Sequence, residues 1–584
     1  MIYHDTIRVL YIDMKSQKIR VEERADLKQY MGGVGVAAKL LEENMHPELP
    51  PLDPAQPVVF AIGALSTIYP VITKTTAMFI SPLTGELGES HAGGRMALTM
   101  FSAGYDAMVI YNKASRPTYL TISENDVVFN DARPFWGSEK DNLGRVIRHS
   151  NQMSGKRSII RIGTAGENQV SYACVTVDRY RHFGRLGLGA LFGSKHLKAI
   201  NLIGTRDIPI QNFKEYFKVY REIYDICTKS NTMAKYHDAG TPINVVPLND
   251  AGGLPTLNMQ QNRFGGATEI CGEQFALKQQ VRKLACAGCP VACIHIGQFK
   301  REFADDQHEY ETVNVGYDYE LIFALGTFLG IGDREQILQL IEEVEIVGLD
   351  AMSAGVALGW ATEALEKGLI TLDDTIVPLR FNHYKGYMKA VHHIAEVKNE
   401  FYRNLGKGVK HAASVYGGED YAMHIAGTEM PGYHTGYGSL TGAAVGARHS
   451  HLDNGGYALD QKMEHPADVD AIVDALLKEE IERCMLNSLV ICLFARNVYS
   501  RKMILAAFHA IGEEMTDEEL TAVAHRNYAT KLRIKKALGF DLNDVKFPKR
   551  FFKTPSMRGR LDEATAYEIL QKYRERLAAL EGTE

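Results

Sequence analysis

The sequence predicts an α+β fold in which a β-rich N-terminal domain precedes two mainly helical domains. Residues 1–205 contain short apolar runs bounded by Gly, Pro, Asn and Asp, a pattern typical of strands. From about residue 209 onward, apolar side chains recur at three- and four-residue spacing, which indicates helices. At 584 residues the chain is too long for one hydrophobic core. We therefore expect domains over residues 1–205, 206–415 and 416–584.

The individual elements follow from the same two patterns. The expected strands cover residues 7–13, 18–23, 57–63, 77–82, 107–113, 118–123 and 158–163, followed by an apolar run at 197–204. The clearest helical periodicities cover residues 212–229, 333–348, 466–484 and 561–582. A glycine-rich, aromatic stretch at 405–457 separates two helical sections. The segment 33–38 fits a dinucleotide-binding pattern, but no strand precedes it, so a tight turn that opens a helix at 35–44 is favoured.

Composition limits the classes of function. The chain has 65 basic and 71 acidic residues, a formal net charge of −6, which gives no reason to expect nucleic-acid binding. The N-terminal segment lacks the basic start and apolar run of a signal peptide, and no apolar stretch reaches the length of a membrane span. We therefore expect a soluble, cytoplasmic protein.

The strongest chemical signal is a group of three cysteines, Cys286, Cys289 and Cys293, at C-x2-C-x3-C spacing. Three thiolates on a short loop can converge on one soft metal centre, and a fourth, remote cysteine would complete the ligands of a [4Fe–4S] cluster. A structural zinc site and buried free thiols are the alternatives. No spacing rule selects the fourth ligand among the remaining cysteines: Cys492, Cys484, Cys271, Cys227 and Cys174.

Three further segments combine glycine or histidine with charge. Residues 181–195 and 90–95 contain glycines that allow close backbone approach and arginines suited to phosphate or carboxylate. Alone, such a loop is more often a turn beside solvated charges, but two such loops in one domain favour an anionic cofactor. In residues 447–456, His449 and His451 could transfer protons near neutral pH or could belong to a surface loop.

Taken together, these segments resemble the tungsten-pterin aldehyde:ferredoxin oxidoreductase family over nearly the whole chain. Further landmarks of the resemblance are residues 81–85, 103–106, 166–168, 193–200, 319–320, 324–326, 348–350 and 492–494. The resemblance implies a tungsten (or molybdenum) ion held by two pterins, with Mg as a candidate bridge between their phosphates. It also implies a [4Fe–4S] cluster whose fourth ligand is Cys492.

The resemblance carries over further site residues. Family positions that contact the pterins fall on Lys74, His91, Gly93, Arg181, His182, Gly184, Arg185, Glu345, Leu349, Asp350, Arg448, Asn487 and Ile491. The active-site glutamate falls on Glu320, and its histidine partner falls on His451 rather than His449 if a one-residue gap is allowed. Glu320 would accept a proton if burial raised its pKa toward neutrality, and His451 would orient a carbonyl.

Several positions depart from the family pattern. Lys74 stands where Arg is common, Glu345 and Asn487 stand where Asp is common, and His182 and Phe183 replace small residues. The family's bridging-iron dimer ligands fall on Gln339 and Met388, so that dimer is not supported. The chain looks closer to subfamilies that pair with a small ferredoxin-like subunit.

The function implied is oxidation of aldehydes to carboxylic acids, with electrons passed through one [4Fe–4S] cluster to ferredoxin or to a small iron–sulfur subunit. One alternative keeps the family and makes the chain the catalytic subunit of a low-potential benzoyl-CoA-type reductase. The other alternative is a non-catalytic iron–sulfur electron carrier, which would not need about 200 residues of cofactor loops.

Overall fold

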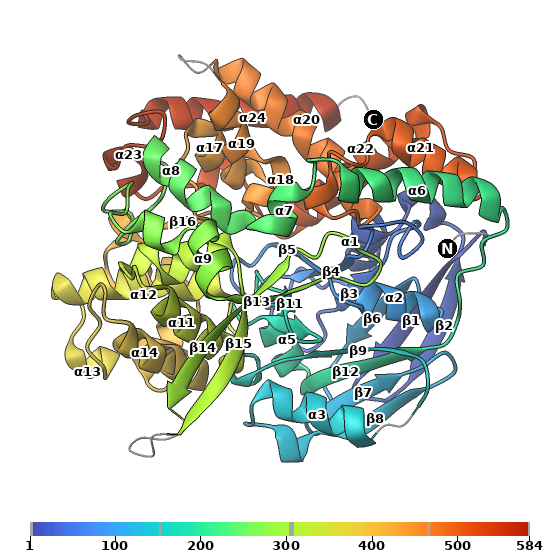
Figure 1. The fold of residues 1–584 in the computed structure, drawn as a ribbon, viewed down its shortest axis with the longest axis horizontal. Coiled ribbons are helices and arrows are strands. Elements are labelled where there is room, and N and C mark those ends of the chain that lie inside the picture. Colours follow the sequence, from blue (N-terminus) through green and yellow to red (C-terminus); the bar gives the residue numbers. More distant parts are fainter. Residues whose placement is uncertain (1–3, 151–152, 303–308, 464–467, 582–584) are drawn as a thin grey trace. The chain divides into compact units, whose positions relative to one another are not determined.

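The computed structural model describes residues 4–150, 153–302, 309–463 and 468–581. The chain forms two compact units, each assembled from segments that are far apart in the sequence (Figure 1). The first unit contains Met1–Ala234, Ala285–Val291 and Glu479–Phe540, and the second contains Lys235–Leu284, Ala292–Lys478 and Asp541–Glu584. A β-rich beginning followed by a mainly helical chain confirms the predicted α+β class. The three domain boundaries stay a prediction.

Two six-stranded sheets, each with parallel and antiparallel pairs, form the β-structure of the first unit. The first sheet has the order β2 (Ile19–Arg24), β1 (Ile7–Asp13), β6 (Ala107–Tyr111), β3 (Val58–Ala61), β4 (Thr75–Ile80), β5 (Leu87–Ala92). The second has the order β11 (Arg181–Phe183), β10 (Val175–Val177), β9 (Lys156–Arg161), β12 (Leu197–Gly204), β7 (Thr118–Ile122), β8 (Val127–Asp131). Strand β1 pairs in parallel with β6, and β12 pairs in parallel with β7.

The central strands are apolar because both of their faces are covered. All residues of β3, β4 and β12 are buried, as expected for strands inside an α/β-type layer. Phe60 on β3 packs against Phe183 on β11 and Phe192, with ring centroids 5.5 and 6.3 Å apart. These contacts join the two sheets and place the loops after β5 and β11 on one scaffold.

Helices of the first unit surround these sheets. They are α1 (Gly33–Asn44), α2 (Met96–Ser102), α3 (Lys140–Ser150), α4 (Thr164–Glu167), α5 (Leu188–Ser194), α6 (Phe213–Lys229), α21 (Arg501–Ala510) and α22 (Asp517–Ala537). The predicted turn at the start of α1 is confirmed: Gly33 has φ +41°, and a Cβ there would lie 2.4 Å from the Asn487 carbonyl oxygen. The close approach of the Asn487 backbone explains the glycine at this position, and a dinucleotide-binding motif is not needed to explain it.

The second unit is mainly helical and carries one antiparallel sheet, β13 (Gln280–Leu284), β14 (Ile294–Glu302) and β15 (Tyr310–Tyr317). A two-stranded ribbon joins β16 (His424–Ile425) and β17 (Thr428–Glu429). Its helices are α8 (Val245–Ala251), α9 (Gly272–Lys278), α10 (Tyr319–Leu325), α11 (Arg334–Val347), α12 (Ala351–Glu366), α13 (Leu372–Thr375), α14 (Tyr384–Glu396), α15 (Glu400–Leu405), α16 (Val409–Tyr416), α17 (Tyr437–Val445), α18 (His451–Asn454), α19 (Gly456–Lys462), α23 (Arg550–Lys553) and α24 (Glu563–Glu581). Helices α7 (Ala234–Asp238) and α20 (Val469–Ser488) belong in part to each unit.

Acidic N-caps fix the helix starts that position the site. Asp318 accepts from the Leu321 N–H at the start of α10, and Asp333 accepts from the Gln336 N–H at the start of α11. Helix α11 ends at Gly348, which has φ +79°. The periodicity predicted this helix within one residue at each end.

Candidate active site and cofactor loops

A carboxylate and an imidazole meet in the second unit. Glu320 lies in the first turn of α10, and its Oε1 is 3.6 Å from Nε2 of His451, the first residue of α18. The Tyr433 hydroxyl donates to the same Glu320 oxygen at 3.1 Å. The side chains of His451 and Glu320 are 6% and 19% exposed, so the carboxylate keeps limited access to solvent.

Aromatic rings enclose this carboxylate. The Tyr433 ring stacks on Tyr457 at 4.4 Å and lies 5.2 Å from the His451 ring and 5.0 Å from Tyr319. The Tyr319 hydroxyl donates to the Gly432 carbonyl, which holds the loop that carries Tyr433. Tyr319 entered the sequence analysis only as a landmark of the resemblance. Tyr433 and Tyr457 were not singled out, because the stretch at 405–457 was interpreted as a separator between helical sections.

The pKa of Glu320 falls below its ordinary value. Burial opposes its ionisation, but the hydrogen bond and charge of His451 and the Tyr433 hydrogen bond favour the carboxylate more strongly. The expectation that burial would raise this pKa toward neutrality was therefore wrong. Glu320 is ionised at neutral pH and can accept a proton there.

The loop before α18 separates the two candidate histidines. Asp453 accepts from the backbone N–H groups of Arg448 and Ser450 at 3.1 Å, and its carboxylate pairs with the Arg448 guanidinium at 2.6 Å. His449 has φ +55°, and its Nδ1 lies 3.2 Å from the Ala443 carbonyl oxygen. The structure therefore brings His451 to Glu320 and ties His449 to the backbone of α17.

In the first unit, several predicted pterin contacts gather around Gly93. A Cβ on Gly93 would lie 2.5 Å from the Cys286 sulfur, 3.6 Å from the Lys74 ammonium and 3.8 Å from Cδ of Arg181. Burial opposes ionisation of the Cys286 thiol, yet the charges of Arg181 and Lys74 bring its pKa below the ordinary value. The two cations and the thiol therefore lie together beside Gly93.

His91 is held by a buried acidic partner. Its Nε2 lies 2.7 Å from a Glu89 carboxylate oxygen, and its Nδ1 lies 3.2 Å from the Thr76 hydroxyl on the neighbouring strand. Glu89 in turn pairs with Lys531 of α22 at 2.7 Å. Neither Glu89 nor Lys531 was identified from the sequence, because only the tertiary fold brings α22 to β5.

The remaining predicted contacts lie at strand ends and helix ends. In the first unit, His182 belongs to β11, Arg185 follows it, and Asn487 and Ile491 lie at the end of α20. The position of a Gly184 Cβ has no atom within 4 Å, so there is open space beside this glycine. In the second unit, Glu345, Leu349 and Asp350 lie where α11 turns into α12, and Asp350 caps α12 by accepting from the Met352 N–H at 3.0 Å.

Backbone hydrogen bonds join the cysteine loop to Cys492 in the first unit. The Val71 N–H donates to the Gly288 carbonyl at 3.3 Å, and the Val71 carbonyl accepts from the Cys492 N–H at 3.1 Å. The Ala287 N–H donates to Gly94, which places the loop beside Gly93. Cys293 falls in the second unit.

No three His, Cys, Asp or Glu side chains converge around a single point in the part of the chain that the structure describes.

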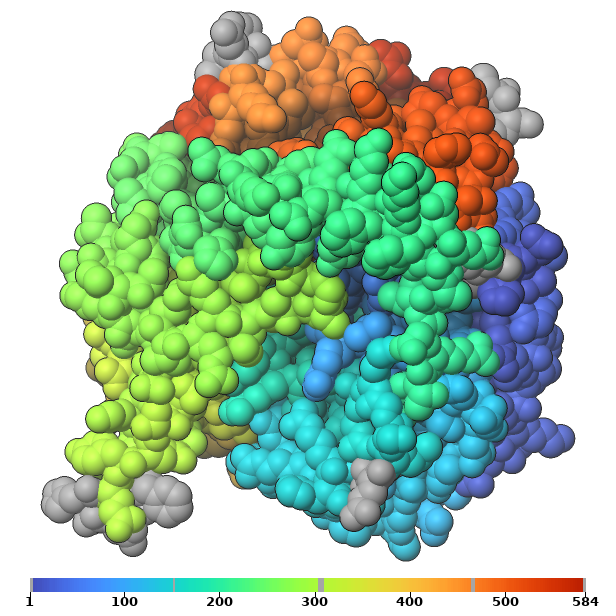
Figure 2. Space-filling view, turned by 45° about the vertical axis from the view of Figure 1, so that its right-hand side comes forward, coloured from blue at the N-terminus to red at the C-terminus, as the bar shows by residue number. Residues whose placement is uncertain are grey.

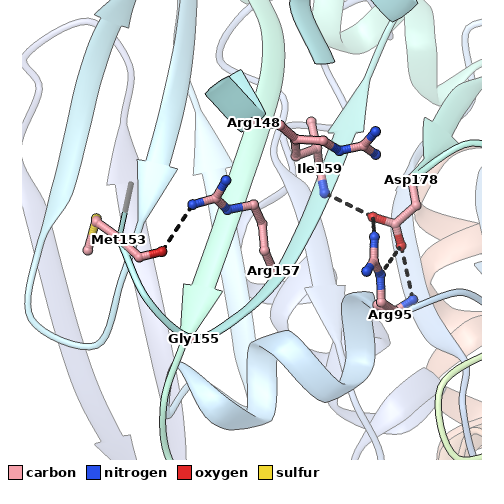
Figure 3. A pocket seen from close by; sticks show the side chains of 7 residues that line it. All are labelled: Arg95, Arg148, Met153, Gly155, Arg157, Ile159 and Asp178. Atoms are coloured by element: carbon pink, nitrogen blue, oxygen red, sulfur yellow. Dashed lines mark hydrogen bonds and ion pairs between the residues drawn. The ribbon is translucent and has the colours of Figure 1, made fainter. Parts of the chain in front are cut away.

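A hollow of about 400 Å³ lies in the first unit, and its lining contains none of the predicted catalytic residues or cysteines (Figure 3). Three arginines, Arg95, Arg148 and Arg157, line it with Asp178. The Asp178 carboxylate holds the Arg95 backbone and side chain and accepts from the Ile159 N–H at 3.2 Å. Arg157 donates to the Met153 carbonyl. Arg95 and Arg157 therefore stabilise the loops that form the hollow.

Among the described residues, no helix has the length and apolar character needed to cross a membrane.

Comparisons with known proteins match this chain in two consecutive parts. Residues 9–204 match the family model "Aldehyde ferredoxin oxidoreductase, N-terminal domain", and residues 218–578 match "Aldehyde ferredoxin oxidoreductase, domains 2 & 3". The tungsten-containing aldehyde ferredoxin oxidoreductase of Pyrococcus furiosus is 30% identical, with 94% of this chain and 92% of that protein covered. Its counterpart in Thermococcus kodakarensis is 29% identical with the same coverage.

Two other similarities extend the comparison. A Pyrococcus furiosus protein named "Aliphatic sulfonate oxidoreductase, WOR-like subunit" is 29% identical over 72% of this chain and 70% of its own length. A chain of the active-site complex BamBC of benzoyl coenzyme A reductase has a TM-score of 0.81 at 20% identity, and the match covers 97% of this chain and 93% of that one. At that identity the likeness supports the fold alone.

Proposed function

The chain belongs to the aldehyde ferredoxin oxidoreductase family, and on that premise we propose that it oxidises aldehydes to carboxylic acids at a tungsten (or molybdenum) bis-pterin centre. One [4Fe–4S] cluster then passes the electrons to ferredoxin or to a small iron–sulfur subunit. In the net reaction, R–CHO and water give R–COOH, two protons and two electrons. Family membership makes the chain an oxidoreductase, which removes the non-catalytic carrier as an alternative.

The observation that carries this proposal is the Glu320–His451 pair. Glu320 is ionised at neutral pH, so it can take a proton from the water that supplies the new oxygen. His451, 3.6 Å away, can donate a hydrogen bond to a substrate carbonyl and orient it. The stacked rings of Tyr433 and Tyr457 limit the water that reaches the carboxylate.

The residues of the first unit fit an anionic pterin. Lys74 and Arg181 supply positive charge beside Gly93, and the buried Nε of Arg181 has no hydrogen-bond partner within the described residues. The open space at Gly184 leaves room for a ligand against the backbone. When bound, the metal–pterin group supplies the two-electron redox chemistry. His91, His182 and Arg185 would complete this set, with Mg as a candidate counter-ion of the pterin phosphates.

The second unit supplies its own predicted contacts, and the cysteines supply the cluster ligands. Glu345, Leu349, Asp350 and Arg448 would hold pterin groups, as would Asn487 and Ile491 of the first unit. The four thiolates of the proposed cluster are those of Cys286, Cys289, Cys293 and Cys492. The bond from the Val71 carbonyl to the Cys492 N–H supports the choice of Cys492 over the other cysteines.

Anaerobically purified protein tests the proposal directly. We expect about one W or Mo, four Fe and two pterins per chain, together with aldehyde oxidation coupled to viologen reduction. Glu320→Gln should lower kcat by about 100-fold or more while metal and pterin contents stay unchanged. The matched control is Glu419→Gln, at an exposed carboxylate of the same unit. Iron without pterin, or full activity of Glu320→Gln, would overturn the proposal.

The reductive alternative predicts a different assay result. A chain that acts like the benzoyl-CoA reductase subunit would turn over benzoyl-CoA with a low-potential donor and leave aldehydes unoxidised. The name of the sulfonate oxidoreductase subunit adds aliphatic sulfonates to the substrates to assay. We favour aldehydes because the relatives that match over 94% of this chain are named for them.

A further inference from the structure

Helix α6 of the first unit exposes a row of aromatic rings. Phe213 is 64% exposed, Phe217 is 47% exposed and Tyr224 is 37% exposed. Phe213 stacks on Phe217 at 5.8 Å, and Tyr220 stacks on Tyr224 at 6.4 Å. At 3.6 residues per turn these four residues share one side of the helix, which we call the α6 aromatic face. Figure 2 shows this green part of the chain on the outer surface.

A row of positive charge borders the α6 aromatic face. Lys214, Lys218 and Arg221 are exposed and follow the aromatic residues around the helix. Arg221 shares the Asp225 carboxylate with Lys229, at 3.2 and 3.0 Å. Helix α6 also carries the exposed Glu215 and Glu222, so its four basic residues exceed its three acidic residues by one and its net charge is +1.

The inner side of the same helix contacts the segment that holds the cysteine loop. The Tyr216 hydroxyl donates to the Ile68 carbonyl at 2.8 Å, and its ring lies 5.3 Å from that of Tyr69. The next residues of that segment lead to Val71, whose backbone bonds to both Gly288 and Cys492.

A second contact chain runs through Tyr499. Its hydroxyl donates to the Pro70 carbonyl at 2.5 Å. Burial raises the pKa of Tyr499 well above its ordinary value, and the neighbouring ionisable groups of Cys227, Tyr69, Tyr220 and Cys289 add to the rise. Cys227 belongs to α6 itself and lies near Cys492. Helix α6 therefore packs against the segment that bonds to Cys492 and to the cysteine loop.

We propose that the α6 aromatic face is the docking surface for a small acidic iron–sulfur protein that takes the electrons from this enzyme. This inference rests on the proposed function, because it assumes a cluster at Cys286, Cys289 and Cys492. Exposed aromatic rings and arginine are enriched at protein interfaces, and a row on one helix suits a small, transient redox interface. Positive charge beside the rings selects an acidic partner and speeds its encounter.

Steady-state assays with two electron acceptors test the proposal on the holoenzyme. One acceptor is an acidic two-[4Fe–4S] ferredoxin, and the other is benzyl viologen, which needs no docking surface. Phe213→Ser/Phe217→Ser should raise the KM for ferredoxin by about ten-fold or more and leave viologen-linked kcat within about two-fold. Lys214→Glu/Lys218→Glu should raise the same KM and flatten its dependence on salt.

The matched control is Leu277→Ser, which removes an apolar side chain that is 77% exposed on α9 of the other unit. An unchanged ferredoxin KM in both α6 variants would overturn the docking surface. Equal losses with both acceptors would also overturn it, because α6 would then be only structural.

The two proposals can fail separately. If the wild-type holoprotein oxidises no aldehyde with viologen, the proposed function fails. Ferredoxin binding is then measured by calorimetry. Equal affinity of the wild type and the Phe213→Ser/Phe217→Ser variant would overturn the docking surface, and about ten-fold weaker binding by the variant would support it.

Discussion

Glu89 and Lys531 form an ion pair at 2.7 Å in which the carboxylate side chain is 0% exposed and the ammonium side chain 3% exposed. The pair joins β5 to α22, and the second oxygen of Glu89 lies 2.7 Å from His91, a predicted pterin contact. Two distant parts of the chain therefore meet at one buried carboxylate. Because His91 bonds to the same carboxylate, this pair links the packing of α22 to the geometry of a predicted cofactor loop.

Removing one member of this pair should destabilise the first unit strongly. Lys531→Met leaves the Glu89 charge buried without its cation, which costs about 3–5 kcal/mol. We expect a lower denaturation midpoint, measured by circular dichroism in urea, with Lys536→Met at an exposed position of the same helix as the control. Glu89→Gln/Lys531→Met should recover part of the loss. Equal midpoints for Lys531→Met and Lys536→Met would contradict the argument.

The lowered pKa of Glu320 gives a definite pH dependence. Proton abstraction requires the carboxylate, so activity is present above this pKa and is lost as the pH falls through it. The wild-type acid limb of kcat/KM should therefore lie below the ordinary value of 4.5. His451→Asn removes the favourable charge and leaves the Tyr433 and backbone hydrogen bonds to oppose the effect of burial, so the limb should move to higher pH.

Tyr433→Phe provides the matched comparison for this titration. It removes one hydrogen bond from Glu320 and keeps the ring, so the limb should move upward by less than in His451→Asn. Viologen-linked kcat/KM across the acidic range measures both shifts. An acid limb that stays in place in His451→Asn would rule out Glu320 as the titrating base.

The two histidines of the 447–456 loop should respond differently to asparagine. His449→Asn keeps a side chain that tolerates φ +55° and can still bond to the Ala443 carbonyl, so kcat should stay within about three-fold. His451→Asn should lower kcat at neutral pH by about 10²-fold because the group that orients the carbonyl is lost. Comparable kcat values for the two variants would remove the distinction between the histidines.

Gly184→Ala tests whether ligand fills the open space in the first unit. The added methyl meets no protein atom within 4 Å, so the fold and its thermal midpoint should not change. If the pterin packs there, its content should fall by about ten-fold, because overpacking costs about 1–3 kcal/mol. Pterin is measured by fluorescence after oxidation. As the control, Gly265→Ala also adds a methyl that meets no atom within 4 Å, and it should keep the full pterin content. Full pterin content in Gly184→Ala would mean that the pterin lies elsewhere.

Local pattern predicted the elements better than it predicted the site. Strand β1 and helix α6 were expected within one residue because apolar periodicity is a local property. Strand β11 was missed because it has three residues and a polar start. Tyr433 and Lys531 were missed because their roles come from contacts between distant segments. The choice of His451 over His449 came from the resemblance alone and stays a prediction, to which the structure adds the 3.6 Å distance from His451 Nε2 to Glu320 Oε1.

The two backbone hydrogen bonds of Val71 connect segments of the chain that are synthesised at different times. Its carbonyl bonds to Cys492 and its N–H bonds to Gly288, and its φ of +59° is unfavourable for a β-branched residue unless both partners hold it. At synthesis rates of about 5–20 residues per second, Cys492 leaves the ribosome roughly 10–40 s after Cys289. The cysteine loop must therefore wait, incompletely held, while most of the second unit is made. If Cys492 is the fourth ligand of the proposed cluster, the complete set of cysteines would therefore exist only late in synthesis, and any factor that protects the first thiols would have to act on the unfinished chain.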